Sequence, residues 1–152
     1  MKGKNIMKKL LLIFAVLFGA GILHAAAPKG WTTDIEAALK TAGSEKKNVL
    51  LLFTGSDWCR YCVRLKNDVL DKDDFQKLCN ENFVPVYFDF PSNSSVSAGQ
   101  MQIQKMWQRK FGVRGYPTVV ILKPDGSRIG TIGGYRPLEA YLNALRQYLP
   151  QK

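Results

Sequence analysis

Two cysteines stand two residues apart in the segment Trp58-Cys59-Arg60-Tyr61-Cys62. An apolar run precedes this segment and a helical pattern follows it, so both cysteines are expected on the first turn of a helix. At that spacing the two sulfurs can reach each other. The free N–H groups and the positive dipole end of the helix favour a thiolate on Cys59, and such motifs lower a cysteine pKa from about 8.5 to as little as about 3.5. Since a thiolate attacks a disulfide and a second cysteine resolves the product, the motif predicts thiol–disulfide exchange.

The elements that must position this motif alternate between helix and strand. Strands are expected where apolar runs are bounded by polar or turn residues, at 48–54, 83–90, 118–122 and 128–132. Helices are expected at 31–47, from 58 or 59 to 70, and at 73–80, 101–111 and 137–149, with a loop at 91–99. The early alternation implies parallel crossovers, and the final pair of strands implies an antiparallel edge. The sequence therefore predicts a single α/β domain with a central mixed sheet flanked by helices.

The start of the first expected helix carries Thr33 and, three residues later, Glu36. This spacing is typical of a capping box, in which the hydroxyl of the first residue accepts a hydrogen bond from a free N–H of the first turn. We therefore expect Thr33 to be the cap of this helix.

The first 27 residues have the pattern of a secretory signal peptide. Four lysines precede an uncharged apolar run at 10–23, and three small residues, Ala25-Ala26-Ala27, follow it. The run of about 14 residues is shorter than the roughly 20 that span a bilayer as a helix. We expect a cleaved signal peptide at 1–27, a domain at 28–152, and a periplasmic or secreted location. The alternative is a leader that stays uncleaved and anchors the chain to the membrane.

Charge and histidine content exclude several function classes. The leader holds four of the 22 basic residues and none of the 12 acidic ones, which leaves a net charge of +6 on residues 28–152. Nucleic-acid binding is not expected of an exported chain without a dense Lys/Arg run. The single histidine, His24, lies in the leader, so the domain has no Ser-His-Asp or Cys-His pair and no histidine-containing metal site. No cofactor and no metal is indicated.

Two segments resemble the thioredoxin superfamily: F-T-G-S-D-W-C-R-Y-C at 53–62 and G-V-R-G-Y-P-T at 112–118. The resemblance covers about residues 46–150 and implies a thioredoxin fold. The W-C-x-x-C segment is similar to that of exported bacterial proteins of the thiol:disulfide interchange type. The second segment resembles the loop in which the family carries a cis proline. It implies that Pro117 is cis and faces the cysteines, and that the backbone of Tyr116 pairs with an extended substrate peptide.

The resemblance also implies roles for the residues around the cysteines, with Cys59 as the attacking thiol and Cys62 as the resolving thiol. Trp58 would pack beside the sulfurs, with simple hydrophobic packing as the other interpretation. Tyr61 is interpreted as a contact surface for substrate, with a catalytic acid as the alternative. Arg60 either stabilises the Cys59 thiolate or is a solvated side chain with a weak, screened effect.

The chain departs from cytosolic thioredoxins between and before the cysteines. Arg60-Tyr61 stand where those proteins carry Gly-Pro, and Phe53 stands where they carry a buried acid six residues before the first cysteine. The usual proton acceptor for the second cysteine is therefore missing, and Asp57 is expected to be exposed at the turn. Cys79, the third cysteine, is interpreted as a buried structural thiol, with a pairing or regulatory thiol as the alternative.

The leading hypothesis is a thiol–disulfide oxidoreductase that acts on exported proteins, with reduction favoured over oxidation. Its partners would be protein thiols and disulfides and a membrane electron-transfer partner, and a monomer is expected. One alternative is a non-catalytic binding module, or a Cu(I)-handling protein, since two thiolates suit Cu(I). A specialised reductant for cytochrome maturation is a further alternative.

Overall fold

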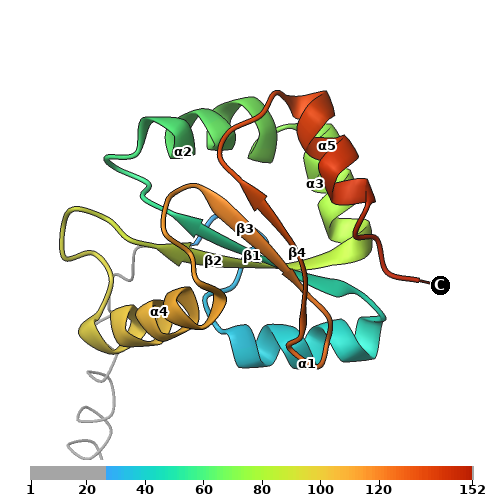
Figure 1. Ribbon diagram of the computed structural model, residues 1–152, viewed down its shortest axis with the longest axis horizontal. Helices are drawn as coiled ribbons and strands as arrows, with labels where there is room; N and C mark the ends of the chain where they lie inside the picture. Colours follow the sequence, from blue (N-terminus) through green and yellow to red (C-terminus); the bar gives the residue numbers. More distant parts are fainter. Residues whose placement is uncertain (1–26, 152) are drawn as a thin grey trace, which may run out of the picture.

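A four-stranded mixed sheet runs through the molecule in the order β2-β1-β3-β4, and helices cover both of its faces (Figure 1). The computed structural model describes residues 27–151. The strands are β1 (Asn48–Thr54), β2 (Phe83–Asp89), β3 (Thr118–Leu122) and β4 (Arg128–Gly133). The helices are α1 (Ile35–Glu45), α2 (Arg60–Leu65), the π-helical turn η1 (Lys66–Leu70), α3 (Asp73–Asn82), α4 (Ala98–Phe111) and α5 (Leu138–Arg146). β1 pairs parallel with β2 and antiparallel with β3, and β3 pairs antiparallel with β4, which confirms the predicted mixed sheet.

The central strand β1 is buried along its whole length and divides the core in two. Because side chains alternate along a strand, Leu50 and Leu52 pack toward α2, α3 and α5, whereas Leu51 and Phe53 pack toward α1 and α4. Figure 1 shows the first group of helices on one side of the sheet and α1 with α4 on the other. The chain leaves the carboxyl end of β1 at Thr54, and the next residues lead into α2.

The predicted cap of α1 is wrong: Asp34, not Thr33, is the N-cap. An Asp34 carboxylate oxygen accepts a hydrogen bond from the Ala37 N–H at 3.0 Å. The helix starts this late because Thr32 is still extended and pairs as an isolated parallel bridge with Val86 of β2. The backbone can enter the helix only after it has left this bridge.

Other helix ends also differ from the sequence prediction. The helix after the cysteines is not uniform, because α2 ends at Leu65 and the next turn, η1, is π-helical. α4 begins earlier than predicted because Ser97 caps it, its hydroxyl oxygen accepting from the Gln100 N–H at 3.2 Å. α5 ends at Arg146, short of the predicted 149.

The predicted signal peptide falls almost wholly on residues 1–26, which lie outside the described residues. Between residues 27 and 151, none of the helices has the length and apolar character needed to cross a membrane.

Candidate active site

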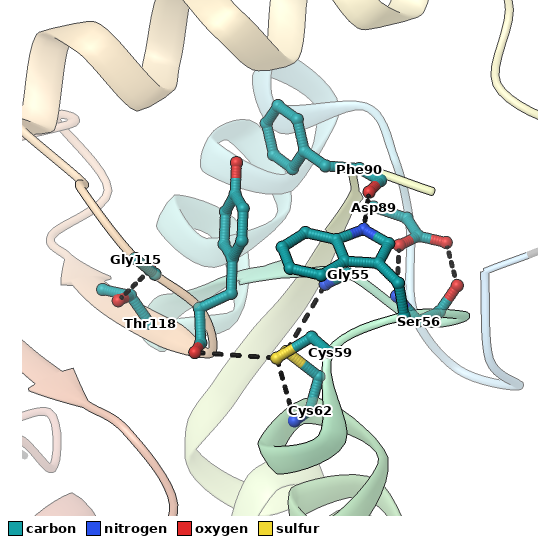
Figure 2. Close-up of a disulfide and its surroundings, with 10 residues drawn as sticks. Gly55, Ser56, Cys59, Cys62, Asp89, Phe90, Gly115 and Thr118 are labelled. Atoms are coloured by element: carbon teal, nitrogen blue, oxygen red, sulfur yellow. Dashed lines mark hydrogen bonds between the residues drawn. A yellow bond between two sulfur atoms is a disulfide. The ribbon is translucent and has the colours of Figure 1, made fainter. Parts of the chain in front are cut away.

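Cys59 and Cys62 form a disulfide at the N-terminus of α2 (Figure 2). Cys59 is the N-cap of the helix, with an extended backbone, and its Sγ accepts a hydrogen bond from the Cys62 N–H at 3.3 Å. The N–H of Gly55, the first residue of the turn after β1, lies 3.4 Å from the Sγ of Cys62. The helix end and these N–H groups favour negative charge on the sulfurs once the disulfide is reduced.

The two sulfurs differ in what they face. Cys59 is 8% exposed, and its Sγ lies 3.7 Å from the carbonyl oxygen of Tyr116. Cys62 is 4% exposed and lines a cavity of about 100 Å³ behind the disulfide, together with Thr54 and Tyr87. The Sγ of Cys59 is therefore next to the Tyr116 loop, whereas Cys62 lines the cavity.

The Tyr116–Pro117 peptide bond is cis, as the resemblance implied. Pro117 is buried, and its carbonyl oxygen accepts a hydrogen bond from the Gly134 N–H at 2.9 Å. Gly134 has a φ of 74° and follows the end of β4. The loop before β3 and the loop after β4 are thus tied together next to the disulfide.

An aromatic cluster covers the turn before Cys59. The indole Nε1–H of Trp58 donates to the carbonyl oxygen of Phe90 at 2.7 Å, and its ring meets that of Tyr116 edge-on at 5.9 Å. The ring of Tyr116 stacks on that of Phe90 at 5.2 Å, and its hydroxyl oxygen accepts from the side-chain amide of Gln108 at 2.8 Å. Burial raises the pKa of Tyr116 above its ordinary value. Trp58 and Tyr116 are therefore packed together, and the carbonyl oxygen of Tyr116 lies next to the Sγ of Cys59.

The sequence analysis missed Asp89, which holds the turn before the cysteines. The backbone N–H of Ser56 donates to one carboxylate oxygen of Asp89 at 2.9 Å, and the Ser56 hydroxyl donates to the other at 2.5 Å. The position of Asp89 at the end of β2, opposite Thr54 of β1, explains this contact. The only sequence signal was a lone acidic residue near the end of an apolar strand.

Asp57 is exposed, as predicted, and it ties the same turn to the loop after β2. Its carboxylate accepts hydrogen bonds from the N–H and the hydroxyl of Ser92, at 2.9 Å and 2.6 Å. These bonds hold the pKa of Asp57 below its usual range. The turn at 55–58 is thus fixed to residues 89–92 by three separate contacts, through Ser56, Asp57 and Trp58.

Phe53, which stands six residues before Cys59, does not face Cys62. Phe53 is fully buried on the opposite face of β1, where it packs edge-on against Phe88. Alternation along the strand turns Thr54 toward Cys62 instead, and Thr54 lines the cavity behind the disulfide. The acid that lines this cavity is Asp71, which is paired with Lys66 at 2.6 Å.

The other predicted residues lie on the surface around the disulfide or in the core. Arg60, the first residue of α2, is exposed, and Tyr61 is 57% exposed. Cys79 is free and 2% exposed, and burial raises its pKa to about 12, which confirms its interpretation as a buried thiol. Across residues 27–151, no cluster of three or more His, Cys, Asp or Glu side chains is arranged to hold a metal ion.

The chain is similar to known proteins over most of the described domain. Residues 35–149 match the family model of a thioredoxin-like domain. Disulfide bond reductase DsbH of Chlamydia pneumoniae is 28% identical over 109 residues, which are 72% of this chain and 65% of that protein. Thioredoxin-related protein DsbJ of Chlamydia pneumoniae is 25% identical over 105 residues, which are 69% of this chain and 30% of that protein. The chain thus spans less than two thirds of the length of either relative.

A solved structure of a DsbH oxidoreductase has the same fold. It superposes with a TM-score of 0.74 at 23% sequence identity, and the match covers 95% of this chain and 99% of that one. The matching family model, which spans most of the chain, and the shared fold agree with the resemblance found in the sequence. The chain therefore belongs to the thioredoxin-like family.

Proposed function

We propose that this chain is a thiol–disulfide oxidoreductase that reduces disulfides in exported proteins. The observation that carries the proposal is the Cys59–Cys62 disulfide at the N-terminus of α2, with the Sγ of Cys59 3.7 Å from the carbonyl oxygen of Tyr116. The name of the relative DsbH, a disulfide bond reductase, supports reduction as the direction. The chain and this relative are 28% identical over the matched part.

In the proposed reaction, the reduced protein gives two electrons to the substrate. The Cys59 thiolate attacks one sulfur of the substrate disulfide, so that a Cys59–substrate disulfide forms and the other substrate sulfur leaves as a thiolate and takes up a proton. The Cys62 thiolate then attacks the Sγ of Cys59. The Cys59–Cys62 disulfide forms, and the second substrate sulfur leaves and is protonated. The substrate is reduced and the protein dithiol is oxidised.

The Tyr116-Pro117 loop would hold the substrate peptide for this attack. Its carbonyl next to Cys59 Sγ suits backbone pairing with an extended peptide, as in strand addition. Trp58 is 54% exposed and Tyr61 57% exposed, so both can contact a substrate without rearrangement of the core.

Cys62 needs a proton acceptor before it can attack, and the cavity behind it supplies a place for water. Its volume of about 100 Å³ exceeds the roughly 10–15 Å³ that one water molecule needs. The cavity is also lined by polar side chains, among them Thr54, Ser56 and Gln76, which can hold water. We propose that water here, rather than a buried carboxylate next to Cys62, takes the proton.

The setting of the reaction is part of the proposal. A leader at 1–27 would direct the chain to the periplasm or outside the cell, either cleaved or as an anchor. Since a reductant in an oxidising compartment must be supplied with electrons, a membrane electron-transfer partner would reduce the Cys59–Cys62 disulfide again. No nucleic acid, metal or small-molecule cofactor enters this scheme, and the chain would act as a monomer.

Single cysteine substitutions test the assignment of the two thiols. We expect Cys59→Ser to abolish reduction of a protein disulfide, and Cys62→Ser to accumulate a mixed disulfide with substrate on a non-reducing gel. Cys79→Ala is the matched control and is expected to retain activity, because this thiol is buried in the core. Activity that survives Cys59→Ser would refute the assignment of Cys59 as the attacking thiol, and a complete lack of activity in the unaltered protein would favour a binding module.

A further inference from the structure

Three exposed arginines stand one or two residues along the chain from Cys59, Tyr116 and Gly134, which belong to the three segments at the disulfide. Arg60 follows Cys59 directly at the start of α2. Arg114 lies two residues before Tyr116, in the loop between α4 and β3. Arg136 lies two residues beyond Gly134, the residue whose N–H is bonded to Pro117. We call these three residues the arginine rim.

The arginine rim is not neutralised by the protein itself. Within the part of the chain that the structure describes, the three ion pairs are Lys47–Glu45, Arg64–Asp68 and Lys66–Asp71, and none of them includes a rim arginine. All three rim side chains are exposed. Their charges are therefore available to a partner that approaches the disulfide.

The acidic side chains of the same region are already used by local contacts. Asp89 is buried and accepts from Ser56, and Asp57 accepts from Ser92. Asp68 accepts from the Tyr135 hydroxyl at 2.9 Å and lies 3.7 Å from Arg64. These hydrogen bonds do not remove the negative charges of Asp57 and Asp89, but Asp68 is offset by Arg64, so the three rim arginines outnumber the unpaired carboxylates.

The spacing of the rim fits residues that flank a bound cysteine. Arg114 lies two residues along the loop from Tyr116. A peptide whose cysteine meets Cys59 and whose backbone pairs at Tyr116 would place its next residues opposite this arginine. Arg136 likewise lies two residues along the chain from Gly134, whose N–H is bonded to the carbonyl oxygen of Pro117.

We propose that the arginine rim selects disulfide-bearing peptides with acidic residues next to their cysteines. This inference rests on the proposed oxidoreductase function and adds a substrate class to it. The exposed indole of Trp58 and ring of Tyr61 provide contact that does not depend on sequence, and the arginines provide the preference by charge complementarity. Arg60 directly follows the attacking residue Cys59, so its substitution would also change the reactivity of that thiol. Arg114 and Arg136 are therefore the residues to substitute in a test of substrate choice.

Three synthetic peptides test the preference. Each contains one disulfide, and they differ only in the two residues next to the cysteines, which are Asp, Asn or Lys. The reduced protein is mixed with each peptide in a single turnover, and the rate is followed by tryptophan fluorescence. Because neighbouring charge also changes the intrinsic reactivity of a disulfide, each rate is divided by the rate of the same peptide with dithiothreitol.

We expect the normalised rates to fall in the order Asp, Asn, Lys, by about two- to fivefold for each acid–arginine pair. The preference should shrink in about 1 M salt, where the Debye length falls to about 3 Å. The double variant Arg114→Gln/Arg136→Gln is expected to lower the Asp-to-Lys ratio to the part that Arg60 alone provides. The control Lys123→Gln removes one exposed charge beyond the far end of β3 and is expected to leave the ratio unchanged.

The outcomes separate this inference from the proposed function. Reduction of all three peptides at equal normalised rates would overturn the substrate preference and leave the oxidoreductase standing. The preference would be overturned equally if the double variant kept the full Asp-to-Lys ratio, or if Lys123→Gln lowered that ratio. Failure to reduce any of the peptides would overturn the proposed function, and the substrate class with it.

Discussion

Replacing Gly55 by alanine tests whether the indole of Trp58 is held over the turn before Cys59. A Cβ at position 55 would lie 2.6 Å from Cε2 and 2.8 Å from Nε1 of Trp58, closer than the 3.0 Å that real Cβ atoms keep. The indole is half exposed and can swing outward, so it would move rather than the backbone. The swing would break its hydrogen bond to Phe90 and its edge-on contact with Tyr116.

The expected magnitude follows from these two contacts. A lost hydrogen bond costs about 0.5–1.5 kcal/mol, and a lost aromatic pair about 0.5–1.5 kcal/mol. Alanine regains about 0.4–1 kcal/mol by restricting the unfolded chain, because the φ of Gly55 is outside the left-handed region. Gly55→Ala is therefore expected to lower the free energy of unfolding by about 1–2 kcal/mol.

A double-mutant cycle with Trp58→Ala separates this mechanism from general damage to the turn. In the Trp58→Ala background the alanine at position 55 meets no indole, so it is expected to stabilise the protein by about 0.4–1 kcal/mol. Urea unfolding followed by circular dichroism measures all four proteins without relying on tryptophan fluorescence. An equal loss of stability in both backgrounds would refute the reasoning, because the clash would then not be with Trp58.

Three further outcomes are expected. Asp34→Ala removes the cap of α1 and is expected to lower the free energy of unfolding by about 0.5–2 kcal/mol, as measured by urea titration. The control Thr33→Ala removes no cap and is expected to leave the free energy of unfolding unchanged. Hydrogen bonds from Ser92 hold the pKa of Asp57 below its ordinary value of 3.8. The stabilisation by these hydrogen bonds is therefore fully present above pH 3.8 and is lost as the pH falls through the lower pKa of Asp57 in the folded protein. Asp57→Asn is expected to flatten this part of the curve of stability against pH, and an unchanged curve would contradict the reasoning. Burial raises the pKa of Cys79 to about 12, so we expect its thiol to react with a thiol reagent at pH 8 only after unfolding, and rapid labelling of the native protein would contradict this.

The strands and the reactive pair could be predicted because their signals are local. The apolar run at 48–54 became β1, and the C-x-x-C spacing after it gave the disulfide at the start of α2. The cis bond before Pro117 came from family resemblance, since spacing alone does not indicate a cis bond.

The contacts around the pair could not be predicted because they depend on register and on which way a side chain faces. β1 is buried on both faces, so its sequence has no polar alternation to show that Thr54, and not Phe53, faces Cys62. The contact of Asp89 with Ser56 follows from the pairing of β1 with β2, which no local pattern reveals. The cap at Asp34 likewise depends on a bridge from the preceding residues to β2.

The reduction potential of the Cys59–Cys62 pair tests the central claim most directly. The protein would be equilibrated in dithiol or glutathione buffers of stepped potential, with the fluorescence of Trp58, which directly precedes Cys59, as the readout. A reductase is expected to have a potential near the thioredoxin value of about −270 mV. A value near about −120 mV would contradict the reductase and indicate an oxidant, and the absence of any reversible transition would contradict redox function altogether.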